Sequence, residues 1–251
     1  MKRNIELSEL STYKGDLKDL ASGKLLISTI NAYSYILAQR DLVFAASLTN
    51  ADVLLPDGVS ITMGKRLLTG EKIKKIAGED FFYYEMNRLN KTGGKCLFLG
   101  SSDKVLARIK ETASKQFPHV QVFVYSPPYK PTFSAEDTRE MLDAVNAIEP
   151  DVLFIGMTAP KQEKWAYENF KDIKATHVVC IGAVFDFYAG TVKRAPKIFI
   201  QFGLEWFYRL IKEPKRLWRR YIFGNPKYII SILHEYFDRG QGPVNDKRQH
   251  K

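Results

Sequence analysis

Cysteines, histidines and long apolar runs are scarce in this chain of 251 residues. Its two cysteines, Cys96 and Cys180, lie in apolar strand-like runs without the spacing of zinc ligands or a disulfide framework. We therefore expect buried free thiols in a reducing cytoplasm. No apolar stretch reaches the length of about 18 residues that spans a bilayer, and residues 1–20 lack the apolar core of a signal peptide. We assign no role to any of the four histidines.

Two motifs are missing as well. A dinucleotide site needs Gly-x-Gly-x-x-Gly after the first strand, where this chain reads Ser28-Thr29-Ile30-Asn31. This weakens, without removing, the alternative of a Rossmann oxidoreductase or methyltransferase. No Asp-x-Asp occurs either, which is consistent with chemistry that needs no metal ion.

The net charge of +10 is concentrated near the C-terminus. Residues 193–251 hold 14 Lys and Arg against 5 Asp and Glu, whereas residues 1–192 hold 24 against 23. Such asymmetry indicates an anionic partner: phosphate groups, an anionic membrane or nucleic acid. A non-enzymatic nucleic-acid-binding module therefore stays open as a second alternative.

Short apolar runs alternate with helical patterns along the first 182 residues or so. This alternation predicts an α/β fold, a Rossmann-like, mostly parallel sheet of about six strands with helices on both faces. The predicted strands are 24–30, 52–55, 95–99, 120–125, 151–155 and 177–181, and the helices 33–48, 80–89, 103–116, 134–148 and 161–170. Residues 59–69 have a mixed apolar and basic character.

Polar and small residues follow the predicted strands. In an open parallel sheet the carboxyl ends of the strands share one edge, where ligands bind. Asp57, in the turn Pro56-Asp57-Gly58, is the best-placed carboxylate there, and Asp186 is the second candidate. A turn aspartate that bonds its own backbone is the structural alternative for Asp57. Gly100 and Gly156 could bring the backbone close to a nucleotide.

The C-terminal quarter has a different pattern. Residues 199–211 predict an aromatic helix that ends at Glu213-Pro214, an arginine-rich helix follows, and Asn225-Pro226 separates it from a third helix over residues 228–237. Basic amphipathic helices with Trp and Phe suit a membrane interface, although a helical subdomain packed on the core fits equally well. We predict a core over residues 1–195, a helical appendage over 196–240 and a disordered tail over 241–251.

Several stretches together resemble the bacterial WecG/TagA/CpsF glycosyltransferases, which include N-acetylmannosaminyltransferases of teichoic acid and surface polysaccharide synthesis. They cover most of residues 25–225 in one order. The stretches are Thr29-Ile30-Asn31, Pro56-Asp57-Gly58, Gly156-Met157-Thr158-Ala159-Pro160-Lys161-Gln162-Glu163, Gly182-Ala183-Val184-Phe185-Asp186, Ala189-Gly190-Thr191-Val192-Lys193-Arg194-Ala195-Pro196, Gly203-Leu204-Glu205-Trp206-Phe207-Tyr208-Arg209-Leu210 and Glu213-Pro214-Lys215-Arg216-Leu217-Trp218-Arg219-Arg220.

The resemblance implies a metal-independent, inverting transfer of a sugar from a UDP-sugar, with no cofactor. N-acetylmannosamine or a related hexose or uronic acid would move to a polyprenyl-diphosphate-linked sugar. The enzyme would work in the cytoplasm, associated peripherally with the inner face of the membrane through its basic C-terminal helices. No nucleic-acid partner is implied, and a homo-oligomer is left open.

The resemblance also implies roles for individual residues. Asp57 would be the general base, Thr29, Asn31 and Gln162 would line the pocket, and C-terminal arginines would bind the diphosphate. One departure is Lys75, which stands where the family often has arginine and which keeps the charge without the bidentate fork. The predicted substrate-binding residues are Thr29, Asn31, Lys75, Gly100, Gly156, Gln162, Arg209, Arg216 and Arg219.

Overall fold

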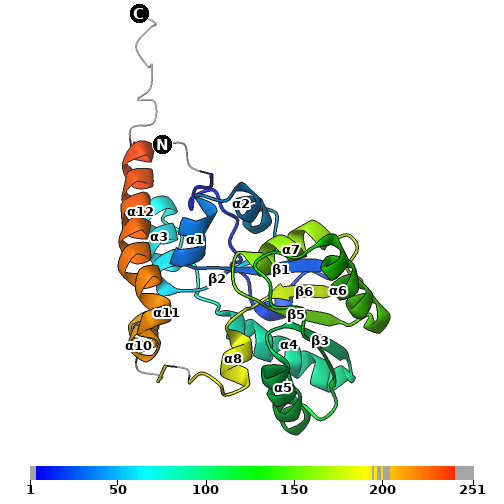
Figure 1. Cartoon of the computed structure of the whole chain (residues 1–251). Coiled ribbons are helices and arrows are strands. Elements are labelled where there is room, and N and C mark those ends of the chain that lie inside the picture. The colour runs from blue at the N-terminus through cyan, green and yellow to red at the C-terminus, as the bar shows by residue number, and fades with distance from the viewer. Residues whose placement is uncertain (1–3, 194, 197–198, 200–203, 241–251) are drawn as a thin grey trace, which may run out of the picture.

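The computed structural model describes residues 4–193, 195, 196, 199 and 204–240. A six-stranded parallel sheet runs through it in the order β2-β1-β6-β5-β3-β4 (Figure 1). The α/β prediction is confirmed, and each strand was placed to within one residue at either end. The strands are β1 (Leu25–Ile30), β2 (Val53–Pro56), β3 (Lys95–Gly100), β4 (Gln121–Tyr125), β5 (Val152–Gly156) and β6 (His177–Cys180).

Helices cover both faces of the sheet, as predicted. Successive side chains of a strand point to opposite faces. Phe98 and Phe154 therefore pack with α4, α5 and α8, whereas Leu97 and Leu153 pack with α6 and α7. The helices of this part are η1 (Leu17–Asp19), α1 (Ala32–Ala38), α2 (Leu42–Thr49), α3 (Val59–Thr69), α4 (Gly78–Thr92), α5 (Asp103–Gln116), α6 (Ala135–Ile148), α7 (Lys161–Asn169) and α8 (Val184–Tyr188).

The single helix predicted over residues 33–48 is wrong. Helix α1 ends at Ala38, and α2 begins at Leu42. The side chain of Asp41 accepts a hydrogen bond from the Phe44 backbone N–H at 3.0 Å, so it caps a new helix at this point. The segment of mixed character over residues 59–69 forms helix α3.

The described C-terminal helices are α10 (Glu205–Lys212), α11 (Pro214–Trp218), the π-helical η2 (Arg219–Phe223) and α12 (Gly224–Gly240). The predicted break at Glu213-Pro214 is confirmed, but the break predicted at Asn225-Pro226 is wrong. Pro226 lies in the first turn of α12, after the wider turns of η2, where its missing N–H is best tolerated. The predicted start of the aromatic helix and the predicted tail over 241–251 fall largely or wholly outside the described residues.

Helix α12 lies against α1 and α3, far from the strands β3 and β4 (Figure 1). Its inner side buries Tyr228 and Ile232 in the same cluster as Phe44 and Tyr35. The carboxylate of Glu235, which is fully buried, accepts hydrogen bonds from the backbone N–H groups of Leu7 and Ser8 at 3.0 and 2.8 Å. The C-terminal helix is thereby joined to the start of the described chain. No helix in the described ranges is both long and apolar enough to cross a membrane.

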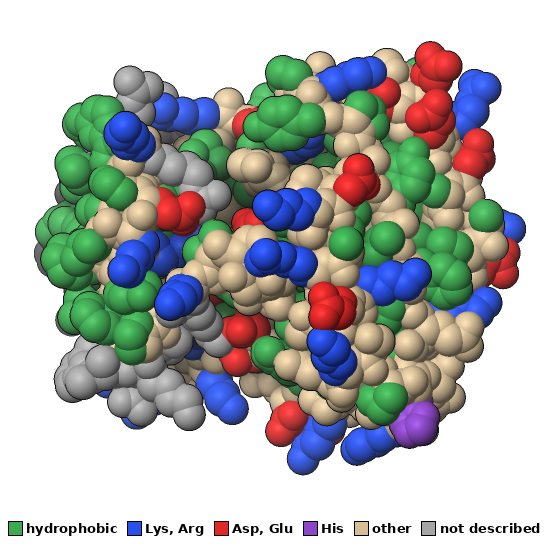
Figure 2. All heavy atoms as spheres, turned by 60° about the horizontal axis from the view of Figure 1, so that its bottom comes forward, with side chains coloured by type: hydrophobic (Ala, Val, Ile, Leu, Met, Phe, Trp, Pro, Cys, Tyr) green, Lys and Arg blue, Asp and Glu red, His purple; other side chains and the backbone are tan. Residues whose placement is uncertain are grey.

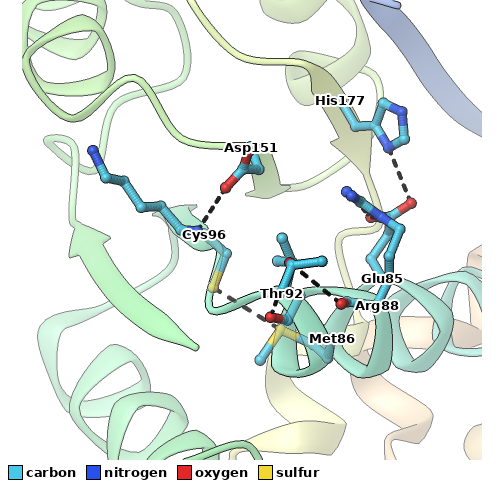
Figure 3. Close-up of polar contacts among 9 residues, drawn as sticks. Glu85, Met86, Arg88, Thr92, Cys96, Asp151 and His177 are labelled. Carbon is cyan, nitrogen blue, oxygen red and sulfur yellow. Dashed lines mark hydrogen bonds and ion pairs between the residues drawn. The ribbon is translucent and has the colours of Figure 1, made fainter. Parts of the chain in front are cut away.

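A buried polar cluster lies at the amino edge of the sheet (Figure 3). One carboxylate oxygen of Glu85 on α4 lies 3.0 Å from His177 Nδ1, where β6 begins. The other accepts from Arg88 Nε and an Nη at 2.9 and 2.7 Å. This cluster of Glu85, Arg88 and His177 joins α4 to β6, at the end of the strands opposite to their carboxyl edge.

The two cysteines are a separate outcome: Cys96 and Cys180 are buried free thiols, as predicted.

Candidate active site

A cavity of about 790 Å³ lies along the carboxyl edge of the sheet. Residues that follow all six strands line it, and α10, α11 and η2 contribute Arg209, Leu217 and Arg220. Figure 2 shows the molecule hollowed between the part that carries the C-terminal helices, at left, and the larger part that holds most of the sheet. The cavity is therefore bounded by the sheet edge on one side and by C-terminal helices on the other.

The cavity brings together many of the predicted site residues. Those that line it are Thr29, Asn31, Asp57, Gly156, Gln162 and Arg209. Lys75 and Gly100 are not among the lining residues. Arg216 lies on α11 and Arg219 on η2, and their side chains fall outside what the structure describes.

Asp57 is fixed at the end of β2 by its neighbours in the sheet. Its backbone N–H donates to the Ile30 carbonyl at 2.8 Å, and the Pro56 carbonyl accepts from the Ile76 N–H at 3.1 Å. Gly58 follows with φ of +125°, a conformation that favours glycine, and α3 begins at the next residue. The second contact also places the backbone beside Lys75 next to this turn.

Arg220 lines the same cavity as Asp57 and lies near enough for the Asp57 charge to act on it. Its guanidinium lies 4.5 Å from the centre of the Tyr33 ring, and its Nε has no hydrogen-bond partner among the described residues. Burial lowers the pKa of Arg220, as does nearby Arg209, whereas Tyr221, Tyr33 and Asp57 act in the opposite direction. An arginine does not lose its proton under such conditions, so this end of the cavity holds a desolvated positive charge.

Arg209 supplies a second guanidinium. It lies 5.2 Å from the centre of the Phe187 ring, and its Nε is likewise buried without a hydrogen-bond partner among the described residues. Guanidinium groups match anions with several oxygens, such as a diphosphate, so two of them in one cavity are chemically suited to such a ligand.

Asn31 has a structural role as the N-cap of α1. Its Oδ1 accepts from the backbone N–H groups of Tyr33 and Ser34, both at 3.1 Å, and the Ser34 hydroxyl accepts from the Asn31 N–H at 2.8 Å. This reciprocal cap begins α1 directly after β1, so it fixes the backbone around Tyr33 at the cavity wall.

Comparison with known proteins decides the family. The family model described as "Glycosyl transferase WecG/TagA/CpsF family" matches residues 5–242. The chain is 32% identical to the N-acetylglucosaminyldiphosphoundecaprenol N-acetyl-beta-D-mannosaminyltransferase of Bacillus spizizenii (strain ATCC 23059 / NRRL B-14472 / W23), across 97% of this chain and 95% of the relative. It is 31% identical to the enzyme of the same name from Bacillus subtilis (strain 168), across 84% and 79%.

The chain belongs to the WecG/TagA/CpsF glycosyltransferase family. It is therefore a glycosyltransferase. This assignment excludes the earlier alternatives of a Rossmann oxidoreductase or methyltransferase and of a non-enzymatic nucleic-acid-binding module. Within the described ranges of the transferase, no three His, Cys, Asp or Glu side chains are grouped so that they could hold a metal ion.

The glycines of the transferase allow close packing behind the cavity. A Cβ on Gly156 would lie 2.3 Å from the Phe185 ring, and one on Gly100 would lie 2.5 Å from the Gly156 carbonyl oxygen. Gly100 thus permits the ends of β3 and β5 to approach, and of these two glycines Gly156 lines the cavity. Asp186, the second carboxylate candidate, also lines the cavity, and its carbonyl accepts from the Thr191 and Val192 N–H groups.

Sequence reasoning missed two side chains. Arg220 reaches the cavity, yet only Arg216 and Arg219 were chosen from that stretch. Helical spacing could not have identified it, because the helix breaks at Glu213-Pro214 between Arg209 and Arg220. Glu163 is the other: it lines the cavity while only 3% exposed, and burial raises the pKa of its carboxyl to about 7.

Glu163 makes the stability of the transferase depend on pH. Its carboxyl ionises near 4.5 when unfolded and near 7 when folded, so the folded protein binds more protons in this window and loses stability as pH rises through it. The shift corresponds to about 3 kcal/mol at about 1.4 kcal/mol per unit. We predict that Glu163→Gln raises the Tm by several degrees at pH 8 and changes it little at pH 5, as measured by calorimetry. An equal change at both values would contradict the assignment.

Proposed function

We propose that this transferase moves N-acetylmannosamine, or a related hexose or uronic acid, from a UDP-sugar to a polyprenyl-diphosphate-linked sugar, with inversion and without a metal ion. One observation carries the proposal: the carboxylate of Asp57 and the guanidinium groups of Arg209 and Arg220 line the same cavity. The names of the two relatives support the acceptor, because both enzymes are named for N-acetylglucosaminyldiphosphoundecaprenol and for mannosaminyl transfer.

The reaction divides between a base and two cations. The acceptor hydroxyl oxygen attacks the anomeric carbon, and Asp57 takes the hydroxyl proton. The bond between the anomeric carbon and the diphosphate oxygen breaks, so UDP leaves with the electron pair. Arg209 and Arg220 stabilise that developing charge in a partly buried setting, where each hydrogen bond to phosphate is stronger than in water. A direct displacement needs only one carboxylate, and it inverts the anomeric centre.

The set of strands along which the cavity runs supports a sugar nucleotide as its ligand. From Asp57 after β2, it extends along the sheet edge to Ser101 after β3 and to Ser126 and Tyr129 after β4. Thr29 and Asn31 belong to the end of β1, which lies between β2, the strand before Asp57, and β6. A nucleotide along this edge would leave its diphosphate and sugar near the arginines and the base, which is the usual arrangement in open α/β sheets.

A donor panel tests this function. Purified transferase is incubated with a synthetic lipid-diphosphate-GlcNAc acceptor and a series of UDP-sugars, and products are read by mass spectrometry with EDTA present. We predict transfer of one N-acetylhexosamine or related sugar, with Asp57→Asn lowering kcat by about 10²–10⁴-fold. Asp186→Asn is the matched control, since Asp186 lines the same cavity. A loss confined to the Asp186 variant would move the base to that residue.

The outer side of the C-terminal helices supports a peripheral position on a membrane, which this proposal places at the cytoplasmic face. Along α12, Ile229, Ile230, Leu233, Tyr236 and Phe237 are all exposed, on the side opposite to the buried Tyr228, Ile232 and Glu235. In Figure 2 hydrophobic side chains gather along the left margin, with basic groups nearby. Lys212, Lys215 and Lys227 are also exposed, so apolar and cationic groups occur together as at a membrane interface.

Vesicle co-sedimentation tests this membrane face. Ile230→Ser with Phe237→Ser removes two exposed apolar side chains of α12, each worth about 1.5–3 kcal/mol when fully buried in lipid. We predict at least a tenfold loss of binding to vesicles that contain anionic phospholipid. The matched control is Leu42→Ser with Val43→Ser, two exposed apolar residues on α2. Equal losses for both pairs would show that the α12 face has no special role.

A further inference from the structure

Gln162 and Glu163 are adjacent, polar and almost completely buried, yet both line the cavity. Their exposed fractions are 4% and 3%. Gln162 Nε2 donates to Glu163 Oε1 at 2.8 Å, and Gln162 Oε1 accepts from the Met157 backbone N–H at 3.1 Å. Each end of the Gln162 amide therefore has its own partner.

These two contacts fix which way the amide faces. If its oxygen and nitrogen were exchanged, Nε2 would meet the N–H donor of Met157, and Oε1 would meet an oxygen of the Glu163 carboxyl. The contact with Met157 would then be repulsive in every case, and the contact with Glu163 would be repulsive while that carboxyl is ionised; leaving buried polar groups unsatisfied is costly. Met157 thus fixes the position of the amide oxygen, and the Glu163 acceptor fixes the position of the amide nitrogen.

Gly182 lies beside the same amide and leaves room for it. It follows β6 with φ of +39°, and a Cβ at this position would lie 3.2 Å from Gln162 Oε1 and 3.4 Å from Nε2. A hydrogen atom in place of a side chain thus lets the amide lie against the backbone. The plane of the amide is restricted by this contact as well as by its hydrogen bonds.

One donor remains for a ligand. A glutamine nitrogen carries two N–H groups, and among the described residues only one of them has a partner. The amide oxygen already accepts from Met157. What Gln162 offers to the cavity is accordingly an N–H donor, which matches an oxygen acceptor such as a hydroxyl, an acyl carbonyl or a phosphate oxygen.

We propose that Glu163 is a positioning residue that turns the Gln162 amide so that its free N–H points to an acceptor oxygen of the bound sugar nucleotide. The inference rests on the proposed function for the identity of the ligand. Glu163 itself touches Gln162 and need not touch the substrate. Its second carboxyl oxygen, Oε2, is buried and has no hydrogen-bond partner among the described residues, so Glu163 accepts from Gln162 through Oε1.

Isosteric variants separate this role from packing. Glu163→Gln keeps an oxygen that can accept from Gln162, whereas Glu163→Leu keeps the bulk and removes the acceptor. We predict that Glu163→Gln keeps KM for the UDP-sugar within about threefold of the wild-type value. Glu163→Leu should raise KM about tenfold or more, the value of one directed hydrogen bond, with a smaller change in kcat. A calorimetric Tm for each variant verifies that it is folded.

A double variant supplies the decisive comparison. If Glu163 acts through Gln162, Gln162→Leu with Glu163→Leu will be no worse than Gln162→Leu alone. Losses that multiply in the double variant, or a Glu163→Leu enzyme with unchanged KM, would overturn the proposal.

A second readout does not depend on transfer. In ¹⁵N-labelled protein the side-chain amide signals of Gln162 are identified by their loss in Gln162→Leu, and their exchange with water is measured. We expect one slowly exchanging amide proton in the wild type and in Glu163→Gln, and fast exchange in Glu163→Leu. Unchanged exchange in Glu163→Leu would overturn the positioning role. If no UDP-sugar is transferred while the exchange pattern holds, the proposed function fails and the orientation of Gln162 stands.

Discussion

The buried carboxylate of Glu235 is the contact on which the arrangement of the site depends. It accepts from two backbone N–H groups near the start of the described chain and from the Tyr35 hydroxyl at 3.1 Å. A buried carboxylate is stable only when donors surround it, so these three donors and this helix stabilise one another. Tyr228, on the same side of α12, donates to the Ser60 carbonyl at 2.8 Å on α3. Helix α12 is thereby fixed at two points along its length.

Helix α1 connects that contact to the chemistry. Asn31 caps the helix at the sheet edge, Tyr33 lies under the Arg220 guanidinium, and Tyr35 reaches Glu235. Because η2 continues directly into α12, the same docking that buries Tyr228 and Glu235 sets where Arg220 lies. The π-helical turn at Arg219–Phe223 is a further local adjustment, of a kind that occurs often at functional sites. The wall of the cavity that holds Arg220 therefore depends on how the C-terminal helices dock against α1.

Much of the fold can be predicted from the sequence, because strands, helix caps and turns are each specified by a few neighbouring residues. All six strands were predictable for that reason, and so was α6, whose start is fixed by the Ser134 cap with its 3.1 Å bond from the Asp137 N–H. Parallel pairing then placed Asp57, Asn31 and Gly156 at one edge without further information. The helix break at Asp41 was missed because apolar spacing continues across it.

What the sequence could not provide are contacts between distant segments. Glu235 and Leu7 are 228 positions apart, and Glu85 and His177 are 92 apart, so neither pair leaves a local signal. Whether Arg219 or Arg220 lines the cavity depends on where α12 docks. The sequence did not predict that docking, because Pro226 suggested a break in the helix. Glu163 was part of a recognised motif, but its role depends on burial, which only the packing around α7 reveals.

The most direct test of this account is a double-mutant cycle between Glu235 and Arg220, measured as kcat/KM for sugar transfer. Glu235→Gln keeps the shape of the side chain but sets an amide NH₂ against an N–H donor, so it weakens the docking of α12 without emptying the core. The account predicts that each single variant loses activity and that the double variant is no less active than Arg220→Ala, within about threefold. Full activity of Glu235→Gln, or losses that multiply, would contradict it.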